Sequence, residues 1–139
     1  MKYLVDTNVL SELRKGAKCH PSVAKWSETE LSSKGGAISV LTIGEIQKGI
    51  LLLKSRDPNQ AAALEAWLTG LRQNFFDRIL PINSDVALEW GRLNAERPLP
   101  AVDSMLAATA NVFGLVLATR DIDDLKNVPV QTVNPFEFS

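Results

Sequence analysis

The sequence is poor in the side chains that form disulfides, zinc sites and histidine-based catalytic triads. Its 139 residues include one cysteine, Cys19, and one histidine, His20, and the two are adjacent. A lone cysteine excludes an intrachain disulfide and is typical of a reducing compartment. A zinc site or a serine–histidine–aspartate triad would need more than these two residues provide. We expect residues 19–21 to form a loop with no ligand role.

Long hydrophobic runs and an excess of basic charge are also missing. No apolar stretch approaches the roughly 20 residues of a membrane span, and no export signal is visible at the N-terminus. We therefore expect a cytoplasmic protein without a membrane segment. Lys and Arg number 15 against 16 Asp and Glu, for a net charge of −1. Proteins that bind nucleic acid usually carry an excess of basic over acidic residues. This chain could therefore bind a polyanion only through a local basic patch or through metal ions.

Short apolar runs alternate along the chain with segments of helical periodicity. With 45% hydrophobic and 22% charged residues, the composition is that of one ordinary globular domain spanning residues 1–139. Strands are expected at residues 3–5, 37–41, 79–82, 115–118 and 130–133, and helices at 7–13, 21–33, 42–54, 60–76, 84–97 and 101–113. This alternation predicts an α/β fold, a three-layer domain with a mostly parallel central sheet flanked by helices.

Acidic residues recur where the apolar runs end. Asp6 directly follows residues 3–5, Glu45 lies just beyond residues 37–41, and Asp121 follows residues 115–118. Asp103 falls in the first turn of the helix that Pro100 introduces. Because ligands of open α/β sheets bind outside the carboxyl ends of the strands, these four acids can gather at one edge of the sheet.

Each acid also has a purely structural interpretation. Asp6 can cap a helix, and Asp103 is favoured by the helix dipole. Thr42 and Glu45 have the spacing of a capping box. However, four caps need not all be acidic, and converging carboxylates repel one another unless a cation neutralises them. With almost no nitrogen or sulfur ligand available, the pattern predicts a Mg²⁺ or Mn²⁺ site.

Such a site suits hydrolysis of phosphodiesters, because a metal ion activates water and offsets charge in the transition state. The bare acids would repel a polyanionic substrate, so the metal would be obligatory. Basic residues close in sequence to the acids could guide a phosphate backbone, although a solvated surface position explains any one of them equally well. These residues are Arg14, Lys15, Lys48 and Arg120.

Four segments together resemble the PIN domain, and more closely the VapC-type toxins of bacterial type II toxin–antitoxin pairs, including the FitB-like branch. They are LVDTNVLSEL at 4–13, SVLTIGEI at 39–46, PAVD at 100–103 and ATRDIDDL at 118–125. The resemblance extends from Tyr3 to the NPF at 134–136. It implies a ribonuclease that uses Mg²⁺ or Mn²⁺ to hydrolyse RNA. It also implies a homodimer and a small antitoxin that binds an apolar face and blocks the metal site.

The resemblance assigns roles to individual residues. The four acids that bind metal and position water are matched by Asp6, Glu45, Asp103 and Asp121. Asp124 matches an additional acid, and whether Asp121 or Asp124 lies closer to the metal stays open. Asn8 and Thr119 match the amide and hydroxyl positions that orient ligands or water.

Two other classes of protein share parts of this pattern. A receiver-like phosphoacceptor domain is also a parallel α/β fold with an acidic pocket. It needs a pair of adjacent acids after the first strand, where this chain has Asp6 alone. It also needs a lysine after a late strand, where this chain has Arg120. A non-catalytic PIN-like module that binds metal or nucleic acid usually lacks one or more acids, and all four are present here.

Overall fold

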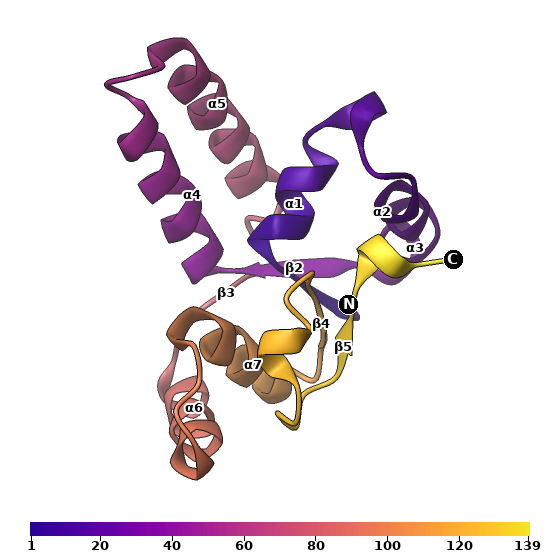
Figure 1. The fold of residues 1–139 in the computed structure, drawn as a ribbon, viewed down its shortest axis with the longest axis vertical. Helices are drawn as coiled ribbons and strands as arrows, with labels where there is room; N and C mark the ends of the chain where they lie inside the picture. Colours follow the sequence, from indigo (N-terminus) through magenta and orange to yellow (C-terminus); the bar gives the residue numbers. More distant parts are fainter.

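Five short strands, all parallel, form the centre of the computed structural model, which describes residues 1–139 (Figure 1). The strands are β1 (Tyr3–Val5), β2 (Gly36–Ser39), β3 (Ile79–Leu80), β4 (Val116–Ala118) and β5 (Thr132–Val133). Their order in the sheet is β3-β2-β1-β4-β5. The direction of winding therefore reverses between β1 and β4, and the carboxyl ends of this pair form the crevice where α/β sheets bind ligands.

Helices cover both faces of the sheet, as Figure 1 shows with the sheet seen nearly edge-on. One face is covered by α1 (Thr7–Leu13), α2 (Pro21–Trp26), α4 (Val40–Leu53) and α5 (Pro58–Asn74). The other is covered by α6 (Ser84–Glu96) and α7 (Ala101–Phe113). The predicted three-layer α/β architecture is confirmed, and the sheet is wholly parallel. No helix combines the length and the apolar character needed to cross a membrane.

The hydrophobic core is split in two by the sheet. In β1, Tyr3 and Val5 pack with α1, α2, α4 and α5, whereas Leu4 packs with α6 and α7. Successive side chains of a strand point to opposite faces. Because both faces are buried, the strand is apolar at every position, which is why the uninterrupted run YLV predicts it correctly.

The remaining segments are short. The predicted helix at 21–33 is continued beyond α2 by a π-helical segment, η2 (Ser27–Leu31), and by α3 (Ser32–Lys34). Three 3₁₀ turns complete the chain: η1 (Gly16–Lys18), η3 (Asp123–Leu125) and η4 (Pro135–Glu137). His20 is not simply a loop residue, because its Nδ1 accepts a hydrogen bond from the backbone N–H of Ser22 and caps α2.

The structure does not support the alternative interpretation of Thr42 and Glu45 as a capping box. Ser39 ends β2 and caps α4 itself, accepting a hydrogen bond from the backbone N–H of Leu41 at 3.0 Å. The helix consequently starts at Val40, and Thr42 lies fully buried inside its first turn. Glu45 therefore has no capping role, and its carboxylate is free for other contacts.

Candidate metal centre

Asp6 joins the two central strands at their carboxyl ends. One carboxylate oxygen, Oδ1, accepts the backbone N–H of Thr7 at 2.7 Å and caps α1. The other, Oδ2, accepts the Thr119 hydroxyl at 2.7 Å from the loop after β4. The side chain is 6% exposed. Burial raises the pKa of Asp6, with smaller contributions from Glu45 and Asp121, and the two hydrogen bonds oppose that rise. Asp6 thus caps a helix and faces other acids at the same time.

Thr119 and Asn8 hold the loop after β4 against the start of α1. The buried Thr119 hydroxyl accepts the backbone N–H of Asp121 at 3.0 Å while it donates to Asp6. The Asn8 amide nitrogen donates to Asp121 Oδ2 at 3.2 Å and, at a longer 3.4 Å, to Asp6 Oδ2. Its carbonyl oxygen accepts the backbone N–H of Arg120 at 3.3 Å. Together these bonds orient the carboxylates of Asp6 and Asp121.

Asp103 reaches the same place from the first turn of α7. Oxygen atoms of Asp6, Asp103 and Asp121, one from each residue, all lie within 4.8 Å of one another. Asp103 makes no ion pair with any basic residue. Its pKa is raised from 3.8 to about 6, first by burial and then by the charges of Asp121, Asp6, Asp124 and Glu45. The three carboxylates therefore repel one another with no cationic side chain to balance them.

Glu45 and Asp124 border this group without joining it. Glu45 Oε1 accepts the hydroxyl of Thr7 at 2.8 Å, and its charge raises the pKa of both Asp6 and Asp103. The sequence alone did not single out Thr7 as a partner of Glu45, although its hydroxyl lies directly beside the first acid, Asp6. Asp124 lies in η3, is exposed, and acts on Asp103 only through its charge. Of Asp121 and Asp124, Asp121 is the one in the three-carboxylate group.

The donor set fits a hard divalent cation. Mg²⁺ and Mn²⁺ prefer carboxylate oxygens, keep several waters and need only a few protein ligands. Three carboxylates gathered at this edge of the sheet supply that kind of site, and hydrogen bonds fix the orientation of two of them, those of Asp6 and Asp121. A cation there would remove the repulsion that raises the pKa of Asp103. Sulfur and imidazole donors are absent from the group.

The candidate basic residues have different environments. Lys48 lines a hollow with Val40, Val102 and Glu45. Lys15 is paired with Glu12 at 2.9 Å. Arg14 and Arg120 each lie over an aromatic ring instead of an acid, Arg14 over Trp67 and Arg120 over Phe136.

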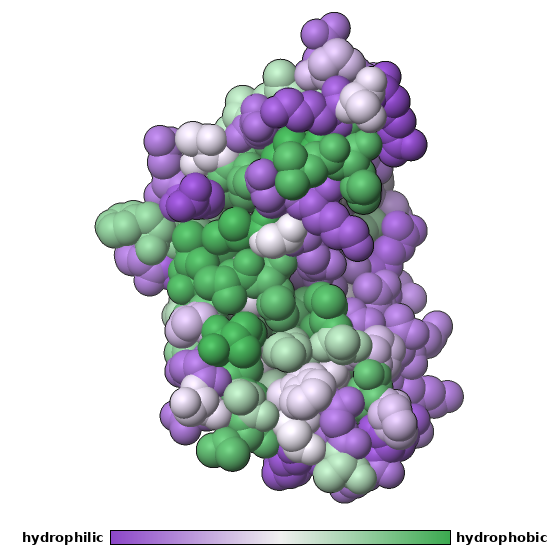
Figure 2. Space-filling view, turned by 90° about the vertical axis from the view of Figure 1, so that its left-hand side faces the viewer, coloured by the Kyte–Doolittle hydropathy of each residue, from purple (hydrophilic) through white to green (hydrophobic).

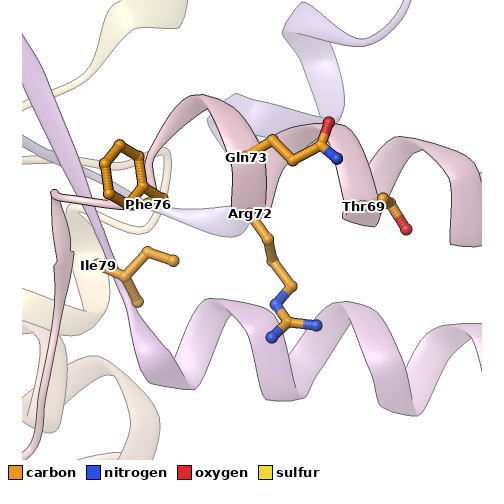
Figure 3. A pocket seen from close by; sticks show the side chains of 5 residues that line it. All are labelled: Thr69, Arg72, Gln73, Phe76 and Ile79. Atoms are coloured by element: carbon orange, nitrogen blue, oxygen red, sulfur yellow. The ribbon is translucent and has the colours of Figure 1, made fainter.

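A larger hollow lies away from the carboxylates, between α5 and β3 (Figure 3). Phe76 and Ile79 form one end of it, and Arg72 extends from α5 alongside them. It has no acidic residue in its lining, so its chemistry does not match that of the strand-end site.

A parallel sheet with a switch point, and three carboxylates gathered there, define an α/β domain with a candidate metal site. The PIN domain family model matches residues 3–131, so the chain belongs to the PIN-domain family. The predicted resemblance to this family and to VapC-type toxins is confirmed.

Individual relatives agree with this assignment. The chain is 30% identical to Toxin FitB of Neisseria gonorrhoeae over 140 residues, covering 96% of this chain and 97% of the relative. It is 33% identical to Ribonuclease VapC14 of Mycobacterium tuberculosis over 82 residues, or 59% and 71% of the two chains. Among solved structures, FitAcB from Neisseria gonorrhoeae superposes with a TM-score of 0.85 at 27% identity, over 98% of this chain and 99% of that one.

Proposed function

We propose that residues 1–139 act as one PIN domain and form the toxin of a type II toxin–antitoxin pair, a cytoplasmic endoribonuclease that depends on Mg²⁺ or Mn²⁺. The observation that carries this proposal is the group of Asp6, Asp103 and Asp121, whose carboxylate oxygens lie within 4.8 Å with no basic side chain among them. The relatives named as a toxin and as a ribonuclease support it.

In the proposed mechanism, Asp6, Asp103 and Asp121 would hold the cation. The bound ion would lower the pKa of a water molecule and offset the negative charge of the phosphodiester in the transition state. Thr119 and Asn8 keep the carboxylates of Asp6 and Asp121 in place through the hydrogen bonds described above. These bonds preorganise the site, so that little reorientation is needed when substrate binds.

Glu45 is the proposed acceptor for a proton from the attacking water. Its Oε1 is engaged by the Thr7 hydroxyl, which leaves Oε2 without a hydrogen bond and directs the carboxylate. A catalytic role for Glu45 distinct from that of the metal ligands would follow from this arrangement.

The proposed partners are a second copy of this chain and a small antitoxin protein. Figure 2 shows apolar surface gathered across the side of the molecule on which α4 and α5 project. Exposed apolar residues on α4 and α7 include Val40, Leu51, Leu52 and Val102. An apolar surface of this kind is typical of a protein–protein interface. The relative named Toxin FitB supports the toxin assignment, and the resemblance to toxins of toxin–antitoxin pairs implies the antitoxin partner.

Cleavage of total cellular RNA by the purified protein tests the proposal, with Mg²⁺, Mn²⁺ or EDTA. We expect discrete RNA fragments with either metal, none with EDTA, and none from an Asp6→Asn variant. Asp77→Asn is the matched control, because Asp77 is exposed and lies outside the carboxylate group. Metal binding without cleavage of any RNA would refute the nuclease and favour a non-catalytic binding module. The receiver-like alternative finds no support in the PIN-domain match.

A further inference from the structure

Arg120 lies between two residues of the carboxylate site and yet pairs with none of its acids. Its neighbours in the chain are Thr119, which bonds Asp6, and Asp121, which belongs to the three-carboxylate group. Its own backbone N–H donates to Asn8. The exposed side chain makes no ion pair and no hydrogen bond. An arginine that served to neutralise the acids would contact one of them.

The guanidinium instead lies on an aromatic ring. Its central carbon is 4.3 Å from the centroid of the Phe136 ring. That distance is well inside the roughly 6 Å range of a cation–π contact. A planar guanidinium that lies over a ring keeps N–H groups at its edge available, and these suit the paired oxygens of a phosphate.

Phe136 is itself held in place from several sides. It lies in η4, where its backbone N–H donates to the Asn134 side chain at 3.0 Å. The His20 ring packs edge-on against it, with the centroids 5.6 Å apart. The strand before it is bonded to the loop that carries Arg120, since Thr119 N–H donates to the Val133 carbonyl at 3.0 Å. The ring therefore limits where the guanidinium can go.

The sheet order shows on which side of the metal centre the guanidinium lies. Asp6 follows β1, and Phe136 follows β5, on the opposite side of β4. Arg120 follows β4 and reaches Phe136, so its positive charge lies on the β5 side of the carboxylates. A strand of RNA whose scissile phosphate lies at the carboxylates would place a neighbouring phosphate on one side or the other of that centre.

We propose that Arg120, positioned by Phe136, binds a backbone phosphate of the RNA next to the scissile one. This inference rests on the proposed ribonuclease function and adds a substrate-binding residue to it. Ordering the side chain before RNA arrives lowers the entropy cost of binding. Two other arginines, by contrast, are already engaged: Arg92 is bonded to Glu89 through two nitrogens, and Arg97 donates to the Lys126 carbonyl.

Equilibrium binding of a labelled oligouridylate, measured over a range of salt concentrations, tests the proposal. Because a phosphate contact is independent of base sequence, the probe does not require the natural target. All variants are made in an Asp103→Asn background with Mg²⁺ present, so that the probe is not cleaved. Arg56→Ala is the matched control, since Arg56 is exposed, has no ion pair and lies beyond the far end of α4.

We expect Arg120→Ala to weaken binding about ten-fold, as loss of a charged hydrogen-bonded pair does. The slope of log affinity against log salt should fall by about 0.7, the value for one phosphate contact on a single strand. Arg120→Lys should keep that slope, because it keeps the charge, and bind roughly three-fold more weakly because it loses the planar fork. Phe136→Leu should also keep the slope and weaken binding two- to five-fold or so, because the guanidinium loses its platform.

With Asp103 intact, Arg120→Ala should raise the KM of RNA cleavage and leave kcat within about two-fold of the wild type. Urea unfolding identifies any variant that fails to fold, and Arg120→Gln then takes the place of Arg120→Ala. Binding and a salt slope equal to those of Arg56→Ala would overturn the assignment. So would a loss of affinity for an antitoxin protein with RNA binding unchanged. If the wild type neither binds nor cleaves RNA with either metal, the ribonuclease proposal itself is overturned.

Discussion

Replacing Asp103 with asparagine should make the metal-free protein more stable while abolishing its activity. Asparagine has nearly the same shape as aspartate and carries no charge. Burial and the charges of four surrounding carboxylates act against the ionised form of Asp103, raising its pKa from 3.8 to about 6. All of these unfavourable effects vanish when the charge is removed. The same side chain is proposed to hold the cation, so stability and activity should change in opposite directions.

The size of the gain follows from the pKa. A rise of about two units corresponds to about 3 kcal/mol between the charged and neutral forms. Because the side chain is only partly buried, solvent screening reduces this to roughly 1–2 kcal/mol. The native state binds the proton more tightly than the unfolded chain does. The wild type therefore loses stability as pH rises from 3.8 through about 6.

Urea unfolding in EDTA measures the effect. At about pH 7.5, Asp103→Asn should have a free energy of unfolding roughly 1–2 kcal/mol above that of the wild type. This difference in the free energy of unfolding should shrink to about half at pH 5. It should disappear as the pH approaches the pKa that Asp103 has in the unfolded chain. Asp77→Asn, in which an exposed acid outside the carboxylate group is changed, is the matched control. Equal stabilities of Asp103→Asn and wild type at both pH values would refute the repulsion argument.

Two further substitutions test the contacts that shape the site. Thr119→Val keeps the shape of a buried side chain but removes its hydrogen bond to Asp6. We expect the free energy of unfolding in urea to fall by about 1–3 kcal/mol and Mg²⁺ binding, measured by calorimetry, to weaken. Unchanged Mg²⁺ affinity would show that this bond does not organise the site. Ser39→Ala removes the cap of α4 and should lower the stability measured by thermal unfolding by about 1 kcal/mol. Thr42→Val should lower it far less, because the Thr42 hydroxyl has no hydrogen-bond partner. A larger loss for Thr42→Val than for Ser39→Ala would support the capping box at Thr42 instead.

Much of the fold could be predicted because the signals are local. The apolar run YLV at 3–5 is buried on both faces and is found as β1. The order of strands and helices implied a parallel sheet, and the acids that come one to three residues after β1 and β4 were recognisable as strand-end residues. Positions 42 and 39 show the limit of such signals. Either Thr42 or Ser39 could cap α4, and the choice depended on where the buried strand β2 ended.

The sequence by itself determined the alternation of elements and the chemistry of the strand-end residues, because each depends on near neighbours in the chain. The tertiary structure alone decided which of the acids converge. Strand order brings Asp6 and Asp121 together across a separation of more than a hundred residues, and α7 adds Asp103. It also put Glu45 against Thr7, kept Asp124 outside the group, and placed Arg120 on Phe136. Such contacts depend on how the chain crosses between strands, and no local pattern of residues records that path.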